Sequence, residues 1–106
     1  MVTEEGPKLE SLAAADFEPL LRQSFLLSRA DRPESLTLVE VEASRVVPPA
    51  GMRAAFSLVF EGEIGCAMLA QGNHVLRNAA LGRLELFLVP IGPAASGAFR
   101  YEAIFA

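Results

Sequence analysis

The stretch of sequence that most strongly indicates the fold is residues 83–91, which read RLELFLVPI. Its three leucines recur at every second position, the period of a β-strand, and therefore share one face. Phe87 and Val89 make the opposite face apolar as well, which is typical of a central strand covered on both sides. We therefore predict a strand that ends at Pro90 and is covered by an opposing sheet and by an N-terminal helix.

The same period recurs on both sides of this stretch. It predicts further strands at residues 24–28, 36–43, 53–61, 73–77 and 99–105. Turn-forming residues separate these segments, and the paired prolines within residues 44–51 exclude that segment from a hydrogen-bonded ladder. Residues 63–71 are predicted to form an irregular loop or a short edge strand.

The strand predicted over residues 36–43 has an imperfect alternation. Its expected apolar face comprises Thr37, Val39 and Val41. Glu40 and Glu42 lie on the other face, and their commonest role at this spacing is that of a solvated outer surface. Leu36 and Leu38 break the pattern, which predicts either a β-bulge or a covered outer face.

The N-terminal part of the chain lacks the strand period. Residues 1–8 are polar and are predicted to form a disordered tail, which leaves residues 9–106 as a single β domain. Asp16 is expected to cap a short helix over residues 16–22, with Pro19 in its first turn. The whole pattern predicts a mainly β protein: a compact antiparallel barrel or sandwich of about six strands with one short N-terminal helix.

Composition narrows the possible partners and compartments. The chain has 106 residues, a net charge of -4 and scattered basic residues, so neither nucleic acid nor an anionic membrane is expected as a partner. Cys66 is the single cysteine and cannot form an intramolecular disulfide, which predicts a cytoplasmic protein. A mean hydropathy of +0.35 is high for a small domain, and predicts a surface that binds a protein partner or a second copy.

The residue types that commonly act in catalysis are isolated from one another in this sequence. His74 is the one side chain with an ordinary pKa near neutrality, and no carboxylate lies close to it in sequence. Cys66 is expected in apolar surroundings, without the base that a nucleophilic thiol needs. One histidine, one cysteine and the pair Glu40 and Glu42 do not form a ligand pattern, so we expect no catalytic residue, no metal and no cofactor.

Residues 45–53 are the most distinctive loop, because two arginines flank the apolar segment VVPPAGM. Arginine and methionine are enriched at protein interfaces, and a proline pair displays its neighbours at little loss of entropy. We therefore predict that Arg45, Met52 and Arg53 bind a partner; an ordinary solvated loop is the alternative.

Several blocks of the chain together resemble a family of small bacterial domains of unknown function. The two most specific blocks are LELFLVPIG at residues 84–92 and YEAIF at residues 101–105. The resemblance extends from Leu9 onward and implies a β domain with no catalytic set to carry over. His74 stands where the family pattern has tyrosine, which favours a structural role for this side chain.

Three classes of function follow from these observations. A non-enzymatic protein-interaction or assembly module agrees best with the apolar surface and the loop at residues 45–53. The alternative is a small β-barrel that binds an apolar ligand, with a cavity lined by Phe56, Phe60, Met68 and Phe87. An enzyme that depends on His74 is the third possibility.

Overall fold

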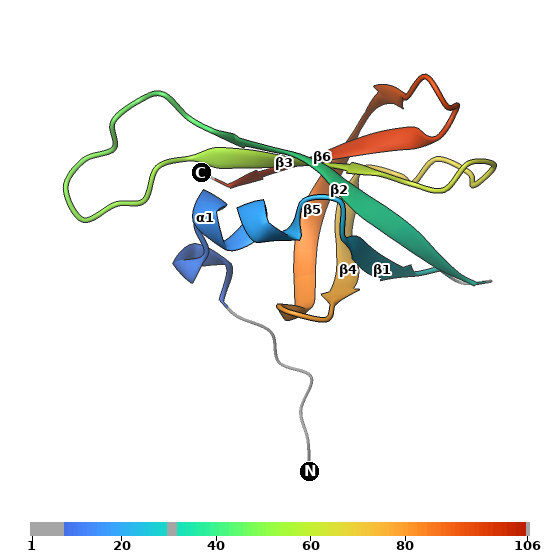
Figure 1. The fold of residues 1–106 in the computed structure, drawn as a ribbon, viewed down its shortest axis with the longest axis horizontal. Coiled ribbons are helices and arrows are strands. Elements are labelled where there is room, and N and C mark those ends of the chain that lie inside the picture. Colours follow the sequence, from blue (N-terminus) through green and yellow to red (C-terminus); the bar gives the residue numbers. More distant parts are fainter. Residues whose placement is uncertain (1–7, 30–31, 106) are drawn as a thin grey trace, which may run out of the picture.

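The computed structural model describes residues 8–29 and 32–105 (Figure 1). The predicted disordered tail at residues 1–8 lies outside the described residues, except for Lys8. The described elements are η1 (Leu9–Ser11), α1 (Ala14–Phe17), η2 (Glu18–Leu20), β1 (Ser24–Ser28), β2 (Pro33–Ala43), β3 (Phe56–Glu61), β4 (Gly72–Asn78), β5 (Gly82–Pro93) and β6 (Phe99–Phe105).

The six strands form a closed antiparallel barrel in the order β1-β2-β3-β6-β5-β4. The predicted mainly β fold with about six strands is confirmed, and closure selects the barrel over the sandwich. Inward-facing side chains from all six strands fill the barrel. The largest that are fully buried are Phe25, Leu27, Leu36, Leu38, Leu58, Phe60, Leu76, Leu84, Leu86, Leu88 and Tyr101. Closure suits a chain of this size because it leaves few strand edges unpaired.

A β-bulge in β2 explains the irregular alternation in that strand. The register with β3 shifts between Leu38 and Glu40, so the side chains change faces there. Before the bulge the inward residues are Leu36 and Leu38, and after it Val41 packs against the core. The prediction of a bulge is therefore confirmed. The inward placement of Thr37 and Val39 was wrong, because the bulge reverses the alternation and Val41 therefore shares its inward face with Leu36 and Leu38.

Strand β5 is longer and less covered than predicted. It runs past Pro90 to Pro93, through a second register shift opposite β6. Its leucine face points into the barrel, but Phe87 on the other face is half exposed. The prediction of two covered faces was wrong, because a closed barrel has a single interior and the N-terminal segment covers its end rather than its side.

The predicted helix is displaced toward the N-terminus and broken. α1 ends at Phe17, and Pro19 lies in the short 3-10 turn η2, so no helix reaches residue 22. Asp16 is not the capping residue: it lies inside α1 and its carboxylate accepts a hydrogen bond from the Ala13 N–H at 2.8 Å. Arg22, with a φ of +71°, then turns the chain into β1.

The two ends of the barrel are closed by different chemistry. The plugged end carries the N-terminal segment, the β2–β3 loop and the C-terminal end of β6; Phe17 is fully buried there, 5.8 Å from the ring of Phe56 and 5.6 Å from that of Phe105. The polar end carries the β3–β4 and β5–β6 connections, and a buried carboxylate, Glu34, lies there. Figure 1 shows α1 and the β2–β3 loop on the left and the connections of the polar end on the right.

Candidate functional site

The β2–β3 loop, residues 44–55, projects from the plugged end of the barrel (Figure 1). The Ser44 N–H donates to the Ala55 carbonyl at 2.8 Å and closes the base of the loop. Within the loop the Met52 N–H donates to the Pro49 carbonyl at 3.1 Å, and Gly51 adopts the positive φ of +83° that this turn requires. The prediction that residues 44–51 form a loop is confirmed, and local turns give it a defined path.

The loop displays apolar side chains to solvent. Val46 is 76% exposed, Val47 is 87% exposed and Met52 is 66% exposed. Arg45 is also exposed and makes no hydrogen bond or ion pair with the rest of the described chain. An exposed apolar segment of this kind on a small domain is typical of an interaction surface.

Arg53 has a different environment from the other two residues predicted to bind a partner. Its Nη1 donates hydrogen bonds of 2.5 Å to the carbonyls of Leu9 and Leu12, and its guanidinium lies 5.6 Å from the ring centroid of Phe56 and 5.4 Å from that of Phe105. These contacts attach the N-terminal segment to the barrel. The structure therefore places Arg45 and Met52 on the loop surface and Arg53 beneath it.

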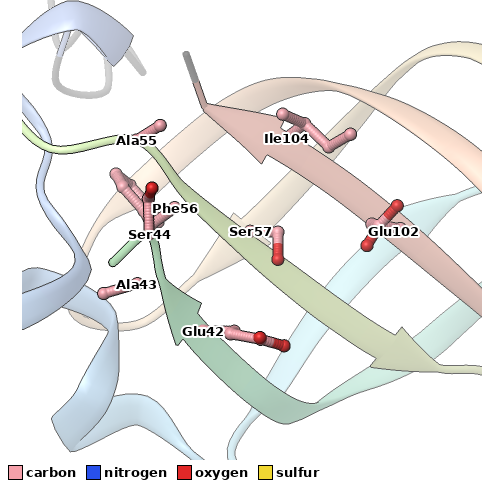
Figure 2. A pocket seen from close by; sticks show the side chains of 8 residues that line it. All are labelled: Glu42, Ala43, Ser44, Ala55, Phe56, Ser57, Glu102 and Ile104. Carbon is pink, nitrogen blue, oxygen red and sulfur yellow. The ribbon is translucent and has the colours of Figure 1, made fainter. Parts of the chain in front are cut away.

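A shallow groove of about 230 Å³ adjoins the base of the loop on the outer face of β2, β3 and β6 (Figure 2). Cross-strand pairing builds its floor: Glu42 lies beside Ser57, and Ser57 lies beside Ile104. Ile104 is 69% exposed, and Ser44, the first residue of the loop, lines one edge of the groove. Figure 2 shows the side chains of Glu42 and Glu102 on either side of Ser57.

The groove face carries more carboxylates than cations. Glu40 and Glu102 flank Val59 in the next cross-strand row, and Glu42 completes a set of three carboxylates on this face. None of the three forms an ion pair with a described residue. By contrast, Glu61 on β3 pairs with an arginine of β6 at 3.0 Å. The bulge in β2 places Glu40 and Glu42 outward, as the sequence predicted.

The polar end contains the strongest cluster of titratable groups. Glu34 is 1% exposed; its Oε1 accepts from Arg29 Nε at 2.6 Å and its Oε2 accepts from the Glu63 N–H at 3.0 Å. Burial by itself would lower the pKa of the Arg29 guanidinium, but the hydrogen bond and the negative charge of Glu34 outweigh burial and raise it. A Cβ added at Gly62 would overlap the Glu34 carboxylate, so any other residue there requires this carboxylate to shift.

Tyr101 extends this cluster into the barrel. Its hydroxyl accepts a hydrogen bond from the Leu69 N–H at 2.9 Å. Burial raises the pKa of the phenol, and the nearby charge of Glu34 raises it further; the Leu69 hydrogen bond and Arg29 act in the opposite direction. Every buried polar side-chain atom of the described residues has a hydrogen-bond partner. The cluster therefore closes the barrel end and offers no unpaired buried group to a substrate.

The remaining catalytic candidates are held apart. His74 Nε2 lies 2.8 Å from the Ala70 carbonyl oxygen, a contact that orients the ring. Cys66 is half buried, and its Sγ accepts a hydrogen bond from Arg32 Nη2 at 2.8 Å. The expectation of apolar surroundings for Cys66 was wrong, because the β3–β4 loop brings the thiol beside an arginine that is distant in sequence.

The residues proposed to line an apolar cavity are also separated. Phe56 and Phe60 point into the filled barrel, whereas Phe87 is 50% exposed and Met68 is 54% exposed. The described residues contain no cluster of three or more side chains suited to hold a metal ion. In the same part of the chain, none of the helices is long and apolar enough to cross a membrane.

Sequence reasoning missed Glu34, because it assigned this residue to a turn, and missed the groove residues Ser57, Glu102 and Ile104. The period of two predicted over residues 99–105 puts residues 102 and 104 on the face opposite to Tyr101. The order of the strands, which brings β6 beside β3, has no signal in the periodicity.

Comparison with known families assigns the chain to a domain family. Residues 12–105 match the family described as "Domain of unknown function (DUF6916)", and the chain belongs to this family. The predicted resemblance to a family of unknown function is thereby confirmed. No curated protein and no solved structure matches the chain significantly.

Proposed function

We propose that this domain is a non-enzymatic protein-interaction or assembly module that binds through the β2–β3 loop and the adjoining groove. The observation that carries the proposal is the exposure of Val46, Val47 and Met52 on a loop that contributes little to the core. Apolar side chains in water are stabilised when a partner covers them. Arg45 and the unpaired carboxylates of the groove supply the directional contacts that a specific interface needs.

The state of the catalytic candidates supports a binding role over an enzymatic one. Nucleophilic catalysis needs a base within hydrogen-bond reach of the nucleophile. Arg32, which donates a hydrogen bond to Cys66, cannot act as a base, and His74 contacts a backbone carbonyl. The charged groups at the polar end are engaged with one another, which is the usual state of a structural cluster.

The alternative of an apolar ligand has less support. Its cavity requires Phe56 and Phe60 to share a space with Met68 and Phe87, but the first two are buried in the barrel and the last two are half exposed. The proposal also includes a cytoplasmic setting for a chain with one half-buried free cysteine. Neither nucleic acid nor membrane is expected as a partner, because the basic residues are not clustered.

A quantitative pull-down with the tagged domain tests the proposal. Met52→Asp places a charge in the exposed loop, and Ile64→Asp is the matched control because Ile64 is similarly exposed, at 72%, in the β3–β4 loop. We expect wild type and Ile64→Asp to capture the same protein and Met52→Asp to lose it, with all three equally folded by circular dichroism. Equal capture by all three, or by none, would contradict the proposal.

A further inference from the structure

The loop and the groove form one surface patch with two complementary halves. The loop half carries Arg45, Val46 and Val47, and the groove half carries Glu42, Glu102 and Ile104. The two halves adjoin at Ser44, which lines the groove and begins the loop. One half is basic and apolar, and the other is acidic and apolar.

The charges of the two halves do not satisfy each other within one molecule. Arg45 forms no ion pair with any described residue, and neither do Glu42 and Glu102. Elsewhere in the described chain, Arg29, Arg83 and Arg100 each contact a carboxylate of the same molecule. The patch thus carries both a cation and carboxylates that have no ion-pair partner among the described residues.

We propose that a second copy of this chain covers the patch, and that the two copies form a two-fold symmetric dimer. A two-fold interface uses the same surface on both copies and must therefore be self-complementary. Rotation about an axis near Ser44 places the loop half of each copy on the groove half of the other. Each Arg45 then faces the partner copy's carboxylates, and Val46 and Val47 cover Ile104.

Charge complementarity favours a second copy over an unrelated partner. The chain carries a net charge of -4, so two copies repel each other in most orientations. The patch opposes this repulsion where the single Arg45 of each copy meets carboxylates of the other copy. This inference rests on the proposed function and names the partner of the same site.

Sedimentation equilibrium of the full chain over a concentration series tests the dimer. We expect wild type to approach twice the chain mass of 11.3 kDa as the concentration rises. Arg45→Glu should weaken the dimer about tenfold or more, since it places like charges together at the interface. Arg83→Glu is the control: it makes the same charge change on β5, outside the patch, and should dimerise as wild type does.

Charge exchange between two variants makes the test specific. The double variant Glu42→Arg and Glu102→Arg should also fail to dimerise alone. Mixed with Arg45→Glu, it should form a heterodimer in which each loop half again faces a groove half of opposite charge. This heterodimer should bind at least tenfold tighter than either variant binds itself. If both variants dimerise as wild type does, or if the mixture stays monomeric while wild type is dimeric, the patch is not the dimer interface.

The outcomes separate this inference from the proposed function. If wild type is monomeric but captures a different protein that Met52→Asp does not capture, the dimer is overturned and the proposed function stays in place. A monomeric wild type with no Met52-dependent capture would overturn both. A dimer that responds to charge exchange supports both, and identifies the assembly as self-association.

Discussion

The two ends of the barrel are both closed to solvent, one by apolar contacts and the other by a buried charged group. The plugged end is closed by apolar contacts in which Phe17 covers Phe56 and Phe105. The polar end is closed by Glu34, which joins Arg29 to the backbone of the β3–β4 loop. Apolar contacts are tolerant of direction, whereas a buried carboxylate must have all its partners in place.

This difference bears on where a binding surface can form. At the plugged end the barrel is sealed by the N-terminal segment, so the β2–β3 loop is free to project and carry Met52 in solvent. At the polar end the loops themselves supply the seal, and the β3–β4 loop contacts Glu34 and Tyr101. Apart from Arg53, the β2–β3 loop makes fewer structural contacts, and it is the better candidate for function.

The largest effect is expected at the centre of the plug. Phe17→Ala removes a fully buried ring and should lower the free energy of unfolding by about 4 kcal/mol. For a domain of this size that is a large part of total stability. Urea unfolding followed by circular dichroism measures the change. A loss below about 1 kcal/mol would show that the N-terminal segment does not close the barrel.

The next largest effect is expected at the polar end. Glu34→Gln keeps the shape of the side chain but leaves Arg29, whose side chain is 18% exposed, without its counterion. We expect a loss of about 3 kcal/mol, mainly from the unpaired guanidinium. The double variant with Phe17→Ala should show additive losses within about 0.5 kcal/mol, because the two sites share no contacts. Strong coupling would mean that the ends are not independent.

At the plugged end, Arg53 is expected to stabilise the fold, whereas the adjacent Met52 is expected to act only at the surface. Arg53→Gln loses the cation that contacts two aromatic rings and two carbonyls, and should lower stability by about 2 kcal/mol. Met52→Asp, at a 66% exposed site, should change stability by less than about 0.5 kcal/mol. Thermal unfolding compares the two. Equal effects would contradict the separate roles assigned to them.

A smaller effect than that of Arg53→Gln is expected at Tyr101, and it depends on pH. The pKa of this phenol is raised above its ordinary 10.0 in the folded protein, chiefly by burial. The folded state therefore holds the proton more tightly than the unfolded state, and stability falls as the pH rises above 10.0. Tyr101→Phe should lower stability near neutrality by about 1 kcal/mol. It should also remove the part of the loss of stability at high pH that comes from ionisation of this phenol.

The sequence offers a direct measurement of this titration. Tyr101 is the only tyrosine and the chain has no tryptophan, so tyrosinate absorbance reports this one group. The absorbance of folded wild type should titrate at a higher pH than that of the chain in denaturant. Titration at the same pH in both states would contradict the burial of the hydroxyl.

Much of the fold could be predicted because strand faces are local information. In the strands predicted at residues 24–28, 53–61 and 99–105 every second side chain faces the core, and Phe25, Leu58 and Tyr101 are buried. Within β2 the predicted faces of Glu40, Val41 and Glu42 are confirmed after the bulge, whereas the faces predicted before it were wrong. The candidate site was predicted in part: Arg45 and Met52 lie on the exposed loop, while Arg53 is held by contacts with Leu9 and Leu12.

The amino-acid sequence by itself determined which residues face the core, where the chain turns, and that residues 44–51 leave the sheet, because these properties depend on neighbours along the chain. Tertiary structure alone decided that the sheet closes, that Glu34 is buried against Arg29, and that Glu102 and Ile104 lie beside Glu42 and Ser57. The physical reason is that periodicity specifies the face of each strand but not its neighbour. Strand order follows from the packing of the whole core. Strand order in turn determines which residues make up every surface that spans more than one strand.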